Sequence, residues 1–528
     1  MRRWNGWGDE AVQPPLDEPA RHFLHERVGP ATPPRDATRE EALARLPAPR
    51  IRSALFSAEP SDRLTHARGQ SFPDWVAMKA GRFGPVADGV AFPTTHEEAR
   101  QALEAALRIG AAVIPYGGGT SVVGHLNVPA GERPVVNISL ERLNRLLAVD
   151  ETSQLATFGA GVTGPQVEGQ LRELGYLVGH FPQSYEYSTL GGWVVTRSSG
   201  QQSYRYGRIE QIFAAGRLVT PRGELRVGGV PASSAGPDLR EVVMGSEGRL
   251  GLLTEVTARI RRLPQQEDFH AVFFPSWEQG LAAVRSIVQH DVPLSMLRLS
   301  NAVETETQLR LAGHEKRIAW LQRYLGMRGI GPGQCMLMMG VTGTAAECRR
   351  MRSEALVLAK RERGVHVGKL VGKSWARNRF AGPYLRNSLW DAGYAADTVE
   401  TCVNWPQATA LMRAVEQAAQ TVLAAENERV HAFTHLSHVY RQGCSLYSTF
   451  VFRSAGDPDA DLARWQRLKQ TVSQAIVGHG GTISHQHGVG ADHAPYVAAE
   501  KGPLGMDLIR AMARELDPQG LMNPGKWP

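Results

Sequence analysis

Two histidines near the end of the chain have the spacing and neighbours of a proton-transfer site. The segment Ser484-His485-Gln486-His487 lies between an apolar stretch and the glycines Gly488 and Gly490. In an extended segment, residues i and i+2 point to the same side, so His485 and His487 could act together. Imidazole titrates near neutral pH, which suits general acid–base catalysis. A metal pair or two satisfied polar residues are the alternatives, but no third ligand is near in sequence, and no metal site is predicted.

Two further polar side chains stand within apolar runs. Tyr447 belongs to the strand-like run 444–452, where a core aromatic is the simpler interpretation. Arg298 is the lone charge of Met296-Leu297-Arg298-Leu299. A buried guanidinium needs an anionic partner, and its planar fork suits a phosphate or a carboxylate. A structural salt bridge within the protein would satisfy Arg298 equally well.

Three glycine-rich segments could hold phosphate groups. Residues 115–121 contain three successive glycines after a strand-like run, which permits a tight turn that exposes several N–H groups on one side. Residues 188–200 and 245–251 are similar in composition. Each could be an ordinary turn, but three such segments in one region favour an extended ligand that contains a pyrophosphate.

A fourth glycine-rich segment, residues 159–164, matches the G-x-G-x-x-G fingerprint of dinucleotide-binding proteins. In those proteins an acidic residue about 20 positions further on ends a second strand. The candidate here, Glu186, lies instead in the polar stretch 183–187. The sequence therefore argues against an NAD site.

The elements that must position these residues fall into four segments of the 528-residue chain. Residues 1–84 form an arm rich in proline and charge, and residues 85–266 alternate strands and helices. Residues 267–487 mix strands with long helices, which predicts an antiparallel sheet covered by helices. Residues 488–528 form a C-terminal segment. The expected long helices are 304–325, 345–363, 407–426 and 459–478, and the expected strands include 135–138, 155–158, 212–219, 252–260, 271–274, 334–341 and 445–452.

Composition and charge narrow the functional class. Hydrophobic residues make up 42% of the chain, and no run approaches the roughly 20 apolar residues of a membrane span. The four scattered cysteines indicate neither a disulfide framework nor a zinc site. The net charge of +7 is spread along the chain, which argues against nucleic acid and suits an anionic substrate or membrane surface. With no apolar N-terminal segment, a cytoplasmic location is expected, with peripheral contact at a membrane surface as a further expectation.

Several motifs together resemble the FAD-linked proteins of the vanillyl-alcohol-oxidase type, also called the PCMH type. The motifs are residues 115–121, 183–192, 245–251 and the ending 516–526. Within this group the chain is similar to the alkyldihydroxyacetonephosphate synthases, because it shares the start 3–8, the stretch 179–200 and residues 484–490. The resemblance implies an α+β fold: a two-subdomain FAD-binding domain, an α+β cap with an antiparallel sheet covered by helices, and a C-terminal segment that returns to the FAD site.

For the cofactor, the resemblance implies FAD bound along four segments. Some relatives attach the flavin to a histidine inside the glycine loop or to a cysteine near the second loop. This chain has Gly119-Thr120-Ser121 and Gly159-Ala160-Gly161 there, so noncovalent FAD is expected. The implied FAD-binding residues are Pro115, Tyr116, Gly117, Gly118, Gly119, Thr120, Ser121, Gln183, Ser184, Tyr185, Glu186, Tyr187, Ser188, Thr189, Thr196, Arg197, Ser198, Ser199, Glu247, Gly248, Arg249, Leu250, Gly251, Leu252 and Leu253.

For activity, the resemblance implies formation of the ether bond of ether lipids. A fatty alcohol replaces the fatty acid of acyl-dihydroxyacetone phosphate without net redox change, and a flavin N5 adduct holds the carbon skeleton between the two steps. Tyr447 would move the proton at the reacting carbon, and His485 and His487 would assist. Arg298 and Arg386 would hold the phosphate, and a structural salt bridge is the alternative for either. The implied partners are a phosphorylated lipid and a fatty alcohol, and a homodimer is a further expectation.

One position departs from the synthase pattern. The synthases commonly have three successive histidines where this chain has His485-Gln486-His487. A glutamine forms hydrogen bonds but does not carry a proton at neutral pH. The main alternative is therefore an FAD-dependent 2-hydroxy-acid dehydrogenase or oxidase, with His487 as base and an arginine on the carboxylate. A catalytically silent flavin-binding protein is a third possibility.

Overall fold

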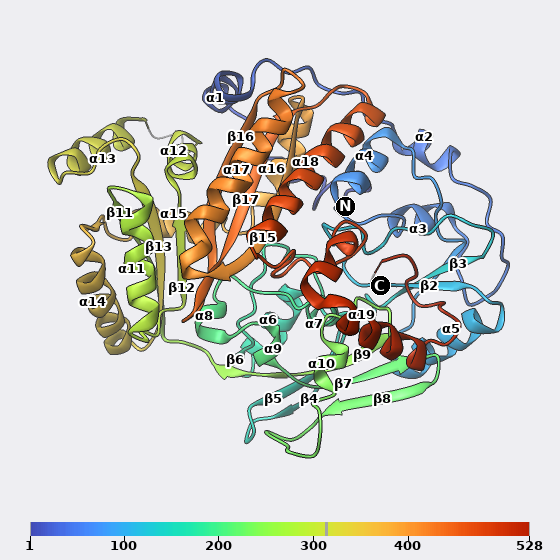
Figure 1. The fold of residues 1–528 in the computed structure, drawn as a ribbon. Helices are drawn as coiled ribbons and strands as arrows, with labels where there is room; N and C mark the ends of the chain where they lie inside the picture. Colours follow the sequence, from blue (N-terminus) through green and yellow to red (C-terminus); the bar gives the residue numbers. More distant parts are fainter. Residues whose placement is uncertain (1, 312–314, 527–528) are drawn as a thin grey trace.

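The computed structural model describes residues 2–311 and 315–526. Two large sheet-containing regions lie side by side in Figure 1, a cap region and a region of two smaller sheets. The N-terminal arm contributes short helices that pack around both. The alternation of strands and helices expected from the sequence is present. The arm helices are α1 (Glu18–Val28), α2 (Arg39–Ala44), α3 (Pro60–Thr65) and α4 (Phe72–Ala80).

The first region consists of two subdomains. Its parallel sheet has the order β1-β3-β2, with β1 at Gly89–Ala91, β3 at Val135–Ser139 and β2 at Ala112–Tyr116. The helix α5 (His96–Arg108) packs against this sheet, and Thr95 caps its N-terminus by accepting from Glu98 N. The antiparallel sheet has the order β4-β5-β9-β7-β8, with strands Leu146–Asp150, Leu155–Gly159, Leu252–Arg259, Phe213–Thr220 and Gly223–Gly228.

The short elements between these strands complete the region. They are α6 (Gly164–Arg172), β6 (Tyr176–Leu177), α7 (Leu190–Val195), α8 (Ser203–Tyr206), α9 (Ile209–Ile212), α10 (Arg240–Val243) and β10 (Arg261–Arg262). The strand before the G-x-G-x-x-G segment, β5, pairs antiparallel with both neighbours. A Cβ on Gly161 would lie 1.7 Å from Leu140 O. These glycines therefore allow close backbone packing and do not form a parallel nucleotide-binding unit.

The cap contains a seven-stranded antiparallel sheet with the order β14-β11-β13-β12-β16-β17-β15. Helices α11 (Trp277–Gln289), α14 (Ala345–Arg361), α17 (Ala408–Ala424) and α18 (Pro458–Gly478) cover one face (Figure 1). The strands are β11 (Gln266–Phe274), β12 (Met296–Ser300), β13 (Cys335–Gly343), β14 (Val365–His366), β15 (Tyr394–Asn404), β16 (Val430–Val439) and β17 (Gly443–Arg453).

Alternation along the cap strands decides which side chains face the site. On β17, Leu446 and Phe450 enter the core under the helices, whereas Tyr447 and Thr449 line a cavity on the opposite face. The same period of two recurs on β12 and β16. Over the cavity lie α12 (Ala302–Leu311), α13 (Glu315–Met327), α15 (Leu370–Asn378) and α16 (Gly382–Asp391). The predicted helix 304–325 thus corresponds to two helices, and its residues 312–314 lie outside the described residues.

The C-terminal segment packs on both subdomains of the first region. The helix α19 (Val497–Leu516) contributes Ala513 to the core of the five-stranded sheet. Further on, Met522 pairs with Val113 of β2, and Lys526 donates to Asn127 O. Within the described residues, no helix is long and apolar enough to cross a membrane.

Candidate active site

A cavity of about 1930 Å³ extends from the glycine-rich loops to the open face of the cap sheet. This volume exceeds the roughly 300–1,000 Å³ of a typical small-ligand pocket, so the cavity can hold a large cofactor together with a substrate. Many of the predicted cofactor residues line it: Pro115, Tyr116, Gly117, Gly118, Gly119, Thr120, Ser121, Gln183, Ser184, Ser188, Thr189, Thr196, Ser198, Ser199, Glu247, Gly248, Gly251 and Leu253.

The first glycine loop is shaped for close backbone approach. A Cβ on Gly118 would lie 1.8 Å from Tyr187 O, and one on Gly117 would lie 2.6 Å from Thr189 Oγ1. Gly119 has a φ of +64°, in the left-handed region that favours glycine. Only glycines therefore let this loop pack on the second loop while its backbone faces the cavity, which fits the pyrophosphate of FAD.

The remaining predicted cofactor residues lie outside the cavity lining: Tyr185, Glu186, Tyr187, Arg197, Arg249, Leu250 and Leu252. Arg197 pairs with Glu241, and Arg249 donates to Met522 O of the C-terminal segment. Tyr185 stacks on Phe380 with ring centroids 4.7 Å apart. The sequence motifs identify whole loops, but successive residues of a turn face opposite sides. For this reason some of the predicted residues do not line the cavity. Their contact with FAD stays a prediction.

A histidine that the sequence analysis missed, His125, also lines the cavity. Its Nδ1 is 2.7 Å from Ser121 Oγ, and its Nε2 is 2.9 Å from Glu247 Oε2. The spacing of four residues after the glycine loop was the available signal. Because both ring nitrogens have protein partners, His125 is not placed to attack the flavin, which agrees with noncovalent FAD.

Tyr447 lies at the other end of the cavity, between two imidazoles. Its ring stacks on His435 at 5.1 Å and meets His487 edge-on at 5.6 Å. Its hydroxyl donates to Thr398 Oγ1 at 3.1 Å. Burial raises the pKa of Tyr447 to about 12, so its phenol is neutral at physiological pH. A neutral phenol can donate a proton or relay one.

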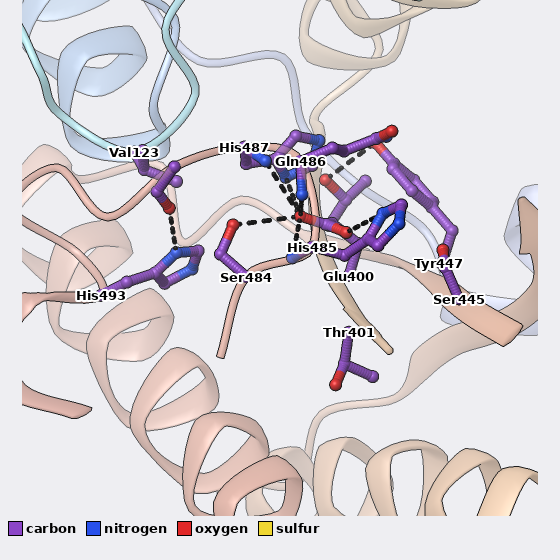
Figure 2. A network of polar contacts seen from close by, with 12 residues as sticks. Val123, Glu400, Thr401, Ser445, Tyr447, Ser484, His485, Gln486, His487 and His493 are labelled. Atoms are coloured by element: carbon purple, nitrogen blue, oxygen red, sulfur yellow. Dashed lines mark hydrogen bonds and ion pairs between the residues drawn. The ribbon is translucent and has the colours of Figure 1, made fainter. Parts of the chain in front are cut away.

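A buried carboxylate absent from the sequence prediction, Glu400 on β15, organises the histidine segment (Figure 2). Its Oε1 accepts from the backbone N–H groups of His485, Gln486 and His487 at 2.8, 2.6 and 3.0 Å. It also accepts from Ser484 Oγ at 3.1 Å. These donors and the two imidazoles hold the pKa of Glu400 well below its ordinary value despite complete burial.

The two histidines of this segment have different surroundings. Because the chain bends around Glu400 and is not extended, only Gln486 and His487 line the cavity. His485 lies behind it, with Nδ1 3.3 Å from Glu400 and Nε2 2.6 Å from Arg208 Nη1. Arg208 can only donate, so Nε2 of His485 accepts and its ring is neutral. The structure therefore places His487, and not His485, where a substrate could meet it.

Gln486, the departure from the synthase pattern, faces the cavity as well. Its backbone N–H is held by Glu400, and its Oε1 atom is buried with no hydrogen-bond partner among the described residues. A buried carbonyl oxygen without a partner is costly unless a ligand supplies a donor. The cavity thus has an unoccupied acceptor beside His487.

The two predicted substrate arginines differ in their partners. Arg298 on β12 pairs with Glu304 at 2.5 Å and approaches His435 Nδ1 at 3.1 Å, so the protein already supplies its carboxylate. Arg386 on α16 has no carboxylate within 4.0 Å among the described residues. Its Nη1 donates to Gln70 O at 2.6 Å. Both arginines line the cavity.

Arg386 is a buried cation in need of an anion. Its guanidinium lies over the ring of Trp75 at 4.4 Å, and its Nη2 is buried without a hydrogen-bond partner. Burial lowers the pKa of Arg386, which reflects a charge removed from water without full compensation. A phosphate in the cavity would supply both the acceptor and the charge.

The unusual N-terminal motif holds the helix that carries Arg386. Trp7 N donates to Asn387 Oδ1 at 3.1 Å, and Asn387 Nδ2 donates back to Trp7 O at 2.9 Å. Gly8 has a φ of +81°, and a Cβ there would lie 2.2 Å from the ring of Tyr384. The arm therefore fixes α16 over the cavity.

The fold and the site define an FAD-linked flavoprotein of the PCMH type, as comparison with known proteins confirms. The FAD binding domain family matches residues 87–229, and the family described as FAD linked oxidases, C-terminal domain, matches residues 263–527. A solved structure of p-cresol methylhydroxylase with substrate bound has a TM-score of 0.67 at 16% identity, over 94% of this chain and 98% of that one. The chain binds FAD, and the predicted α+β fold class is confirmed.

The chain is more similar to one branch of the PCMH-type flavoproteins than to the others compared. An alkyldihydroxyacetonephosphate synthase of Trypanosoma brucei brucei is 31% identical over 99% of this chain and 92% of its own. A solved alkyldihydroxyacetonephosphate synthase superposes with a TM-score of 0.84 at 26% identity, over 99% of this chain and 98% of that one. The chain belongs to the alkyldihydroxyacetonephosphate synthase family.

Proposed function

We propose that this enzyme forms the ether bond of alkyl-dihydroxyacetone phosphate. The ester C–O bond of acyl-dihydroxyacetone phosphate breaks, the fatty acid leaves, and the oxygen of a fatty alcohol forms the new C–O bond. The alcohol proton leaves with the carboxylate, so atoms balance and no electrons are transferred to an acceptor. The family named above supports this reaction over the oxidation of a 2-hydroxy acid.

The observation that carries the proposal is the continuity of one cavity. It joins the FAD loops to the unpaired guanidinium of Arg386 and to Tyr447 and His487, and it continues along an apolar lining. That lining includes Leu309, Ile318, Leu321, Met336, Met338 and Trp375. In this assignment residues 85–266 bind FAD, residues 267–487 cap the substrate, residues 488–528 return to the FAD site, and residues 1–84 secure α16.

Three polar residues of the cavity have roles in the proposed reaction. Arg386 binds the phosphate and thereby fixes the distance of the reacting carbon from Tyr447. Tyr447, as a neutral phenol, relays the proton that leaves and returns to that carbon, and His487 moves a proton to or from the entering and leaving oxygens. When bound, FAD would supply the electrophilic flavin ring that this reaction needs. Pro115–Ser121 and Glu247 would hold it at the lining described above.

Redox neutrality tests the proposed function. Oxidised enzyme incubated without oxygen or any electron acceptor, with palmitoyl-dihydroxyacetone phosphate and hexadecanol, should form many equivalents of ether product. The reason is that the electrons of the substrate never leave the site. Product should be measured per mole of FAD by mass spectrometry. One equivalent or none, together with bleaching of the flavin by lactate, would instead establish the 2-hydroxy-acid dehydrogenase.

We also propose that the cavity mouth contacts an anionic membrane. Around it Trp320 and Leu370 are 70% and 81% exposed, and both line the cavity. Lys316 and Arg317, on α13 beside Trp320, also line it. Exposed aromatic and apolar residues flanked by lysine and arginine favour the interface of an anionic bilayer. A lipid chain could enter from such a surface directly into the apolar lining.

Replacing Trp320 and Leu370 by glutamate should lower binding to vesicles of phosphatidylcholine with phosphatidylglycerol at least tenfold, because each change removes apolar contact and adds repulsion. Cosedimentation measures the bound fraction. The matched control is Leu504→Glu, since Leu504 is 74% exposed on α19, remote from α13 (Figure 1). Equal binding of both variants would contradict the membrane assignment.

A further inference from the structure

The segment that carries His487 is held at its two ends by two buried carboxylates from different regions of the fold. Glu400 of the cap accepts three successive N–H groups, as described above. At the other end, Glu247 accepts from Val489 N and from Gly490 N, the latter at 2.9 Å. The side chains of Glu400 and Glu247 are 0% and 2% exposed. Carboxylates that accept several N–H groups in a dry environment form strong, directional contacts.

Glu247 is also part of the FAD site. It lies in the third glycine-rich loop, lines the cavity and has a positive φ of 53°. Through Oε2 it pairs with His125, whose other ring nitrogen meets Ser121 Oγ in the first glycine loop. A chain of polar contacts therefore runs from the first glycine loop through His125 to Glu247 and on to the backbone beside His487: hydrogen bonds at its two ends and a close His125–Glu247 contact between them.

The glycines of the segment make this close contact possible. Gly488 has a φ of +84°, and a Cβ on it would lie 2.7 Å from Glu247 Oε1 and 2.9 Å from His125. Gly490 has a φ of +54°, and its Cβ would lie 2.0 Å from Val123 O. The two glycines therefore allow the backbone that brings the N–H groups of Val489 and Gly490 to Glu247.

We propose that Glu247 and Glu400 are positioning residues that together fix His487, so that binding of FAD and ordering of the catalytic segment are coupled. A ligand that orders Ser121 and the Glu247 loop lowers the cost of ordering residues 485–490, and the coupling is reciprocal. The part that concerns catalysis by His487 rests on the proposed function. The coupling itself does not.

Hydrogen exchange tests the coupling without turnover. Peptides that cover 484–490 should exchange at least tenfold more slowly in the FAD-loaded protein than after FAD removal. In Glu247→Gln, whose amide presents an N–H where an acceptor is needed, FAD should no longer slow exchange at 485–487. The control is Glu416→Gln, a half-buried cap carboxylate that accepts from Thr434 and Asn301 and lies outside the cavity lining. Equal slowing by FAD in wild type and Glu247→Gln would overturn the coupling.

Kinetics test the position of His487. In Glu400→Gln we expect kcat to fall about 100-fold, as displacement of a reacting group commonly does, with KM nearly unchanged. Glu400→Asp should recover part of this loss. Glu416→Gln should behave as wild type. An unchanged kcat in Glu400→Gln would overturn the role of Glu400, whereas an inactive wild type with intact exchange coupling would overturn only the proposed function.

The pH profile separates positioning from general support of the fold. Burial lowers the pKa of His487, and the negative charge of Glu400 opposes this effect. The other charged or titratable groups that interact with His487 are Asp397 on β15, Lys469 on α18, Tyr447 on β17, His485 and His493. Removal of the Glu400 charge should therefore move the His487 limb of the kcat profile to lower pH. A limb that stays in place would contradict the assignment.

Discussion

Replacing Tyr447 by phenylalanine should lower turnover by about 10² to 10⁴ while FAD binding stays near that of the wild type. The change removes one hydroxyl, which donates to Thr398 and faces the cavity, and it leaves the ring stacked on His435. Tyr447 lies on the cap sheet, outside the loops assigned to FAD. Steady-state formation of ether product and flavin absorbance per polypeptide measure the two quantities.

The matched control for this prediction is Tyr394→Phe. Tyr394 is a buried tyrosine of the same sheet, on β15, and its hydroxyl donates to Gly29 O at 2.8 Å outside the cavity lining. This variant should lose at most about 1 kcal/mol of stability, typical of one hydrogen bond, and keep its turnover. If Tyr447→Phe lost flavin or unfolded, Tyr447 would be a core aromatic. Equal turnover in the two variants would remove Tyr447 from the proton path.

The glycine loops could be predicted from sequence because their signal is local. A strand followed by three glycines has few conformations, and the structure places Gly117 and Gly118 on the cavity, as expected. The motif does not distinguish neighbours such as Arg197 and Ser198, of which only Ser198 lines the cavity. Composition and motif identify a loop, but the direction of each side chain depends on what packs behind it.

The role of Glu400 could not be predicted from a local sequence signal. This residue precedes His485 by 85 residues in sequence, and its strand shows no motif. Its role follows from register: in the cap sheet Glu400 pairs with Tyr447 on one side, and Tyr447 pairs with His435 on the other. Cross-strand partners share a face, so these residues from three strands lie side by side, with Tyr447 and His435 lining the cavity and Glu400 buried next to them. Only the order of strands, fixed by long-range packing, brings them together.

The short separation of Arg298 and Glu304 in the sequence is compatible with an ion pair between them and also with the predicted phosphate contact of Arg298. Arg298 lies on β12, and Glu304 lies six positions further on in the first turn of α12, close enough for a local ion pair. Arg386 offered no such neighbour. From the sequence both arginines are assigned to the phosphate, Arg298 as the lone charge of an apolar run and Arg386 through the resemblance to the synthases. The structure distinguishes them by their partners.

Arg386→Lys should therefore raise KM for acyl-dihydroxyacetone phosphate about 10- to 100-fold, since a lysine keeps the charge but loses one arm of the fork. Arg298→Lys should raise KM far less, because its guanidinium is held by Glu304 and His435. Initial rates against substrate concentration give both values, and FAD content confirms the fold of each variant. A larger rise in KM for Arg298→Lys than for Arg386→Lys would mean that Arg298, and not Arg386, binds the phosphate. Equal effects would mean that both arginines hold it, which requires the Arg298–Glu304 pair to open when substrate binds.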